Sequence, residues 1–339
     1  LMGGAVVVVF LHNVPYKWFQ VFPVFLYPIS LVLLAFVTLM GIITGDRVNG
    51  AARWMTFMGL QFQPSELAKM AVIIAVSFIL SKRQDEEGAN PKAFKYIMIL
   101  TGLVLLLIAP ENLSTAMLLF GVVFMMMFIG RVAAKKLLLL AGGLVLIVAL
   151  GVGTVVAIPA KTLHNTPGLH RLETWQNRIK GFFDKDEVPA AKFDIDKDAQ
   201  IAHARIAIAT SHVVGKGPGN SIQRDFLSQA FSDFIFAIVI EEMGLIGGIF
   251  VVFLYLCLLM RAGRIAQKCE RTFPAFLVMG IALLLVSQAI LNMMVAVGLF
   301  PVTGQPLPLV SKGGTSTLIN CAYIGMILSV SRYTAHLEE

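Results

Sequence analysis

The sequence has little charge. Aspartate, glutamate, lysine and arginine make up 14% of its 339 residues, while 57% of the residues are hydrophobic. Soluble domains carry about 25% charged residues, so a soluble fold of this length is excluded. With a mean hydropathy of +0.80, the chain is predicted to be an all-α polytopic membrane protein, a single transmembrane domain over residues 1–339.

Cysteine and histidine are also scarce. The three cysteines, Cys257, Cys269 and Cys321, lie in or beside apolar runs without metal spacing, so we expect free thiols and no disulfide framework. The six histidines are scattered and show no zinc pattern. The net charge of +7 is spread among the loops, which argues against nucleic acid as a partner.

Apolar runs predict about nine membrane spans, at residues 1–11, 20–44, 65–81, 94–110, 113–130, 134–158, 233–260, 272–299 and 314–332. Loops rich in lysine and arginine follow the third, fifth and seventh spans, and the positive-inside rule makes their side cytoplasmic. Loops 45–64, 159–232 and 300–313 then face outward. Because the truncated first run begins outside, we expect a missing upstream span and ten spans in all.

The outward segment 159–232 is too long for a simple connector. Residues 171–183 are predicted to form an amphipathic helix, lying either at the lipid surface or against the outer ends of the spans. Residues 184–198 are charged and contain proline, which indicates a flexible link. A helical pattern returns from Ala199 to Thr210.

Three acidic residues stand out in the segment 229–248. Asp233 lies at the mouth of an apolar helix, and Glu241 and Glu242 follow about two turns further in. An ionisable group within a membrane span is costly and therefore suggests a functional site. The alternatives are that Asp233 caps the helix and that the glutamates pair with neighbouring helices.

A second polar group lies at the start of the third span. Arg47 and Arg53 occupy the outward loop before it and could bind phosphate. Pro64 suits the first helical turn, and Glu66 suits its positive end. Lys69 is at i+3 from Glu66, so the two can form an ion pair, which is also the purely structural reading.

Two outward loops are rich in glycine. In residues 215–221, GKGPGNS, three alternating glycines allow backbone N–H groups to approach an anion, although a plain flexible loop is the alternative. In residues 300–320, two prolines stiffen the loop before Ser311, Lys312, Gly313 and Gly314 introduce the last span. A helix N-terminus of this kind binds anions or is merely capped.

Taken together, these signals predict an outward cavity with a carboxylate, several cations and glycine-rich backbone in a lipid-accessible bundle. Such a cavity suits a lipid-linked diphosphate, with its tail between the helices.

The motifs NGAARWM, FQPSELAK, QAFSDFIFAIVIEEMGLIGG and FPVTGQPLPLVSKGGTS, spread between residues 49 and 316, resemble those of the SEDS family, whose members include FtsW and RodA. The resemblance implies a ten-span peptidoglycan glycosyltransferase that polymerises lipid II with inversion and releases undecaprenyl diphosphate. It leans towards the FtsW (division) branch. PENLSTA at 110–116 departs from the family's Pro-Asp-Leu-Gly-Thr, and Lys312 replaces the usual tyrosine.

The resemblance implies roles for individual residues. Asp233 would be the catalytic base, or the ligand of a divalent cation, Mg or Mn, that supports the diphosphate. The expected substrate-binding residues are Arg53, Glu66, Lys69, Gln200, Lys216, Ser311, Lys312, Gly313 and Gly314.

The expected partners are lipid II, the nascent glycan strand, membrane lipid and a class B penicillin-binding protein transpeptidase. The expected location is the bacterial inner membrane, with the active site facing the periplasm. Three other functions stay open: a lipid II flippase, an elongation-type (RodA) polymerase and a divisome scaffold. A flippase would show inverted repeats and broken helices, and the sequence shows neither clearly.

Overall fold

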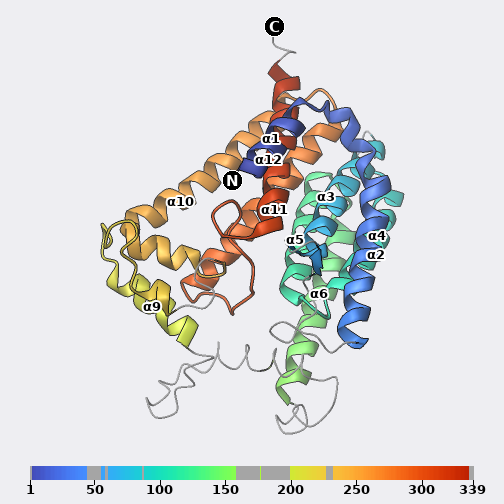
Figure 1. Cartoon of the computed structure of the whole chain (residues 1–339). Coiled ribbons are helices and arrows are strands. Elements are labelled where there is room, and N and C mark those ends of the chain that lie inside the picture. Colours follow the sequence, from blue (N-terminus) through green and yellow to red (C-terminus); the bar gives the residue numbers. More distant parts are fainter. Residues whose placement is uncertain are drawn as a thin grey trace. The chain divides into compact units, whose positions relative to one another are not determined.

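The protein is seen here as a computed structural model that describes residues 2–43, 55–57, 60–85, 88–157, 176, 199–226 and 232–335. Among the described residues, nine apolar helices fall on the predicted spans: α1 (Met2–Asn13), α2 (Phe22–Ile43), α3 (Pro64–Lys82), α4 (Pro91–Ile108), α5 (Leu113–Ile129), α6 (Ala134–Ala157), α10 (Ile235–Lys268), α11 (Thr272–Ala296) and α12 (Gly314–Ala335). Seven are long and apolar enough to cross a membrane, and α1 and α5 are shorter. The predicted all-α polytopic fold is confirmed (Figure 1).

Shorter elements connect these helices. They are the 3-10 helices η1 (Tyr16–Gln20) and η3 (Gln223–Asp225), the antiparallel pairs β1 (Met55–Phe57) with β2 (Leu60–Phe62) and β3 (Gln84–Asp85) with β4 (Gly88–Ala89), and helix α9 (Ala199–Thr210). Helix α9 confirms the pattern predicted at these residues. The amphipathic helix and the link predicted at 171–198 lie outside the described residues, except for Gln176.

The chain divides into two compact units. The first comprises residues 1–148, 258–287 and 314–339, and the second comprises residues 149–257 and 288–313.

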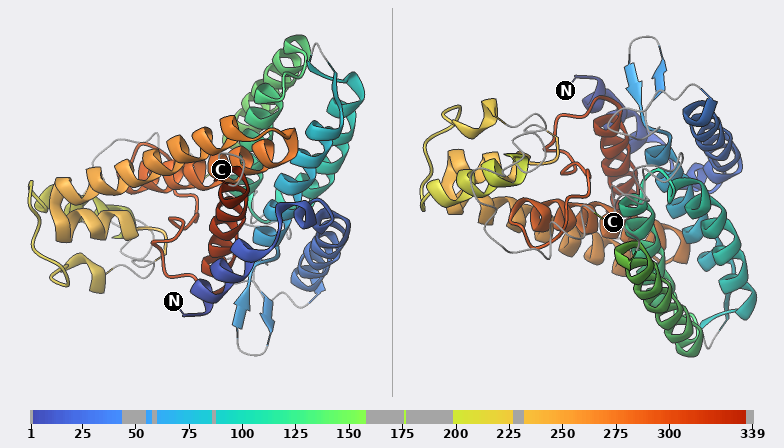
Figure 2. Two further views of the ribbon diagram at one scale, coloured as in Figure 1. Left: turned by 90° about the horizontal axis from the view of Figure 1, so that it is seen from above. Right: turned by 90° about the horizontal axis from the view of Figure 1, so that it is seen from below.

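Helix α3 forms the core of the first unit. From Ala68 to Val76 no side chain is more than 7% exposed, and the helix contacts α2, α4 and α5. At the two ends of the chain, α1 packs against α12 (Figure 2). Gly325 makes this contact close, because a Cβ there would lie 2.8 Å from Cβ of Leu11.

The second unit contains α9, the first part of α10, the end of α11 and the loop that follows it. The apolar run at 233–260 was expected to be one continuous helix. Instead, α10 is interrupted at Gly244, whose φ of 70° and ψ of −170° are not helical. That combination is essentially restricted to glycine. The expectation that the chain has no clearly broken helix was therefore wrong.

Candidate functional site

Asp233 lies two residues before α10, at the mouth of the helix as predicted, and is half-buried. The Ser232 hydroxyl donates a hydrogen bond to its Oδ1 at 2.9 Å. The main-chain carbonyl of Asp233 accepts a hydrogen bond from Nδ2 of Asn292 on α11, at 2.8 Å. The first regular bonds of α10 begin one residue later, at the Phe234 carbonyl. The position of Asp233 is therefore set by contacts outside the helix.

The loop 300–313 is attached to the same place. The Ser311 hydroxyl donates to the Ser232 carbonyl at 2.6 Å and accepts from the Leu307 N–H at 2.8 Å. Asn292 Nδ2 donates a second hydrogen bond, to the Gln305 carbonyl at 2.7 Å. The loop and the start of α10 therefore share two side-chain links.

Two further side chains hold this loop. The Tyr255 hydroxyl donates to the Pro308 carbonyl, and Gln288 Nε2 donates to the Pro306 carbonyl at 3.0 Å. Lys312, the next residue after Ser311, is exposed. Gly314 begins α12, as the sequence predicted. The loop thus presents a cation beside residues that are fixed to the Asp233 segment.

Glu241 forms a second polar cluster, two turns into α10, and its side chain is fully buried. Its carboxylate forms an ion pair with Lys216 at 2.6 Å and accepts a hydrogen bond from the Ser221 hydroxyl at 2.5 Å. The N–H groups of Ile222 and Gln223 each donate to it at 3.3 Å. A buried carboxylate with these four donors is well compensated. Glu241 is therefore paired, as one reading of the sequence expected, but its partner is the loop at 216–223 and not a neighbouring helix.

The glycine-rich loop closes the break in α10. The N–H groups of Lys216 and Gly217 donate to the carbonyls of Glu241 and Glu242, at 2.9 and 2.8 Å. On the other side of the break, Leu245 N–H donates to the His212 carbonyl at 3.3 Å. An interrupted membrane helix needs such partners, because lipid offers none.

These hydrogen bonds weigh against the prediction that the loop binds an anion. Two of its N–H groups, and the Lys216 ammonium, are engaged with α10. The loop comes this close because Gly215 faces Gly244. A Cβ on Gly215 would lie 2.5 Å from the Glu242 carbonyl oxygen, and one on Gly244 would collide with the Val213 carbonyl oxygen. The loop therefore has a structural role: it supplies hydrogen-bond partners to the backbone of α10 at the break.

In the first unit, Glu66 and Lys69 form the ion pair predicted from their spacing, with 2.8 Å between Lys69 Nζ and Glu66 Oε1. Pro64 opens α3 and Glu66 lies in its first turn, both as predicted. Glu66 is 2% exposed and Lys69 is fully buried. The ion pair therefore places two opposite charges in the core of the first unit, where they neutralise each other.

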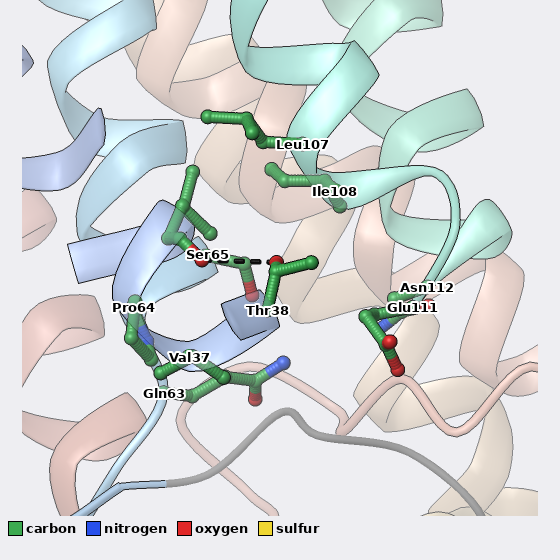
Figure 3. A pocket seen from close by; sticks show the side chains of 10 residues that line it. Val37, Thr38, Gln63, Pro64, Ser65, Leu107, Ile108, Glu111 and Asn112 are labelled. Carbon is green, nitrogen blue, oxygen red and sulfur yellow. Dashed lines mark hydrogen bonds between the residues drawn. The ribbon is translucent and has the colours of Figure 1, made fainter. Parts of the chain in front are cut away.

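A small pocket lies beside the start of α3 (Figure 3). Mostly apolar side chains from α2 and α4 meet polar groups at the start of α3 and just before α5. The lining residues are Leu34, Val37, Thr38, Gln63, Pro64, Ser65, Leu107, Ile108, Glu111 and Asn112. Asn112 caps α5 by accepting from the Thr115 N–H at 3.2 Å. The PENLSTA departure from the family's motif thus keeps a helix cap.

The remaining predicted site residues are placed as follows. Arg47 and Arg53 lie outside the described residues. Gln200 belongs to the first turn of α9. Ser311 and Lys312 lie in the loop attached to Asp233, and Lys216 lies in the Glu241 cluster. Within the second unit, the site therefore has two polar clusters about two helical turns apart along α10.

Two residues were missed: Asn292, which binds the Asp233 segment, and Gln288, which binds the loop 300–313. They are polar, 1% and 2% exposed, and four residues apart in a mostly apolar helix. That spacing puts them on one face. Polar residues repeated on one face of a membrane helix were the available signal.

Within the part of the chain that the structure describes, no three or more histidine, cysteine, aspartate or glutamate side chains gather as a metal site would require. The cysteines Cys257, Cys269 and Cys321 are free thiols, as predicted.

Fold and site together define a class: a multi-pass helical membrane protein with a carboxylate at the mouth of a broken helix, held by a polar loop. Residues 1–336 match the family described as cell cycle protein and designated by FtsW, RodA and SpoVE. The chain belongs to this family.

Its relatives agree with this assignment. A probable peptidoglycan glycosyltransferase FtsW of Trichlorobacter lovleyi is 34% identical over 305 residues, 89% of this chain and 74% of the relative. A protein with the same description from Geobacter sp. (strain M18) is 35% identical over 322 residues, 94% of this chain and 80% of the relative.

Solved structures show the same fold. A chain from a peptidoglycan synthase complex, studied for its coordination of polymerization and crosslinking, aligns with a TM-score of 0.74 and 26% identity. That alignment covers 98% of this chain and 88% of the other. The rod shape determining protein RodA of Thermus thermophilus aligns with a TM-score of 0.64 and 24% identity, over 97% of this chain and 84% of RodA.

Proposed function

We propose that this protein is a peptidoglycan glycosyltransferase that polymerises lipid II for septal cell-wall synthesis. The observation that carries the proposal is Asp233, a half-buried carboxylate fixed at the mouth of α10 by Ser232 and Asn292. The family assignment and the relatives described as glycosyltransferases support it. The protein lies in the inner membrane, and the mouth of α10 faces the periplasm.

The chemistry follows from one carboxylate. The 4-hydroxyl of an incoming lipid II attacks the anomeric carbon of the growing strand. The bond from that carbon to the undecaprenyl diphosphate oxygen breaks, and the configuration inverts from α to β. Asp233 accepts the hydroxyl proton as general base. The diphosphate leaves as an anion. When cations stabilise its charge, no second carboxyl group is needed as a general acid to protonate it.

The cations available to the leaving group include Lys312, which is exposed on the loop attached to the Asp233 segment. Mg²⁺ binds through one or two carboxylates together with substrate phosphates. Asp233 therefore fits a divalent cation only jointly with the diphosphate, and such a cation would neutralise leaving-group charge. Arg53, Glu66 and Lys69 stay proposed as substrate-binding residues, as the family resemblance implies.

The product strand requires crosslinking, so we place a class B penicillin-binding protein transpeptidase beside this enzyme. The related peptidoglycan synthase complex, which couples polymerization to crosslinking, supports this partner.

The test is polymerisation of purified lipid II, followed by gel analysis of the glycan products. Asp233→Asn should lower the rate by at least about 100-fold, the contribution of a general base. Glu270→Gln is the matched control, because Glu270 is an exposed carboxylate beyond the other end of α10. Activity of a folded Asp233→Asn protein equal to that of the control would refute the catalytic assignment.

The break at Gly244 favours one second candidate, a lipid II flippase, because transporters use interrupted helices. Within the described helices, however, Gly244 alone has a positive φ, so no repeat-related partner for the break is seen. Labelled lipid II in vesicles separates the two functions. Translocation without polymer formation would favour the flippase.

A further inference from the structure

We propose that Asn292 is a positioning residue for Asp233. Its side-chain amide joins the segment that carries the carboxylate to the outward loop 300–313. This inference rests on the proposed function and adds a residue to it.

The first argument is hydrogen-bond geometry. A side-chain amide has two N–H donors on one nitrogen. In Asn292 both point at main-chain carbonyls, that of Asp233 at 2.8 Å and that of Gln305 at 2.7 Å. The two acceptors lie 72 residues apart in sequence, yet one planar group fixes both. Any shift of Asp233 relative to the loop must break one of these bonds.

The second argument is burial. Asn292 is 1% exposed and belongs to the mostly apolar helix α11. Burying an amide costs free energy unless its polar atoms are hydrogen-bonded. The two carbonyls satisfy both donors, whereas the buried Oδ1 accepts no hydrogen bond from the described residues. The two donated bonds are therefore what holds this polar group in the core of the unit.

The third argument is that the neighbouring carbonyl is held as well. The Ser232 carbonyl accepts from Ser311 at 2.6 Å. Two consecutive carbonyls, at Ser232 and Asp233, are thus bound by side chains from two different segments of the second unit. Neither carbonyl is needed for the first regular turn of α10, which starts from Phe234. This double link fixes the direction in which the main chain enters the helix, and with it the carboxylate.

The consequence for catalysis is geometric. A base must stay within hydrogen-bond reach of the hydroxyl it deprotonates, and a displacement of about 1 Å costs about 100-fold in rate. Asn292 touches neither the substrate nor the proton in this proposal. It acts only by holding Asp233 and the loop in one arrangement.

The experiment measures kcat and KM for lipid II polymerisation. Asn292→Leu keeps the size of the side chain but removes both donors. The matched comparison is Gln288→Leu, since Gln288 lies one turn earlier on α11 and binds the same loop at Pro306. We expect Asn292→Leu to lower kcat at least about tenfold more than Gln288→Leu, with KM changed about equally in both.

A double variant separates positioning from a general loss of structure. If Asn292 acts only through Asp233, then Asn292→Leu should lower kcat by about 100-fold in the native background. In the Asp233→Asn background its additional effect should fall to about threefold or less. An undiminished additional loss in that background would overturn the inference.

Two further results make the test decisive. If Asn292→Leu does not fold, Asn292→Asp is used, because it is isosteric and replaces the donor Nδ2 with a carboxylate oxygen. A wild-type kcat in Asn292→Asp would also overturn the inference. Equal kcat losses in Asn292→Leu and Gln288→Leu, with Asp233→Asn inactive, would refute the positioning role alone. An active Asp233→Asn protein would instead refute the proposed function.

Discussion

Replacing Gly244 with alanine tests the interrupted helix directly. The backbone of Gly244 has a φ of 70° and a ψ of −170°, which strains any residue with a Cβ by about 1–3 kcal/mol. The added methyl group would also collide with the Val213 carbonyl oxygen. The collision is relieved only if the loop 212–217 moves away from α10.

That movement breaks hydrogen bonds. The loop makes four main-chain bonds across the break, from Lys216 to Glu241, Gly217 to Glu242, Leu245 to His212, and Ile246 to Val213. Each contributes about 1 kcal/mol net. Losing two of them in addition to the strain lowers the free energy of unfolding by about 4 kcal/mol.

The control lies in the same helix. Gly263→Ala adds the same methyl group where nothing lies within 4 Å, and it should leave stability unchanged or raise it by about 0.5–1 kcal/mol. The assay is the apparent Tm of detergent-purified protein, followed by size-exclusion after heating. Gly244→Ala should melt at least about 5 °C below Gly263→Ala. Equal Tm values would mean that α10 is not interrupted as described.

Two further predictions concern the first unit. Lys69→Met leaves Glu66 buried without its cation and should lower the free energy of unfolding by about 3–5 kcal/mol. In the same heating assay, adding Glu66→Gln should restore most of the lost stability. No recovery in the double variant would contradict the pairing argument. Burial raises the pKa of the Cys269 thiol from 9.0 to about 11. The thiolate is the reactive form, and a raised pKa shifts its formation to higher pH. The rate of iodoacetamide labelling should therefore still rise about tenfold per pH unit between pH 8 and 10. Peptide mass spectrometry measures this rate, and a plateau near pH 9 would exclude the raised pKa.

Local features could be predicted from the sequence. The spans follow from apolar run length, and the pair between Glu66 and Lys69 follows from i,i+3 spacing. The placement of Asp233 at a helix entrance follows from its position just before an apolar run. Each of these depends on residues within a few turns of one another.

Features that depend on distant segments could not be predicted. The sequence around Gly244 is typical of a continuous apolar helix, and only the loop at 212–217, about thirty residues away, accounts for the break. Likewise, nothing near Lys216 in sequence identifies Glu241 as its partner. The link from Asn292 to Asp233 spans 59 residues. Such contacts arise from tertiary packing and have no local periodicity.

The pairing of Glu66 with Lys69 within one turn has a consequence for how the protein is made. Both partners belong to α3, so their charges neutralise each other as soon as this helix forms. The nascent segment can then leave the insertion machinery for the bilayer before any later helix has been synthesised. A lysine whose counterion lay on a later helix would have to wait for that helix to be synthesised.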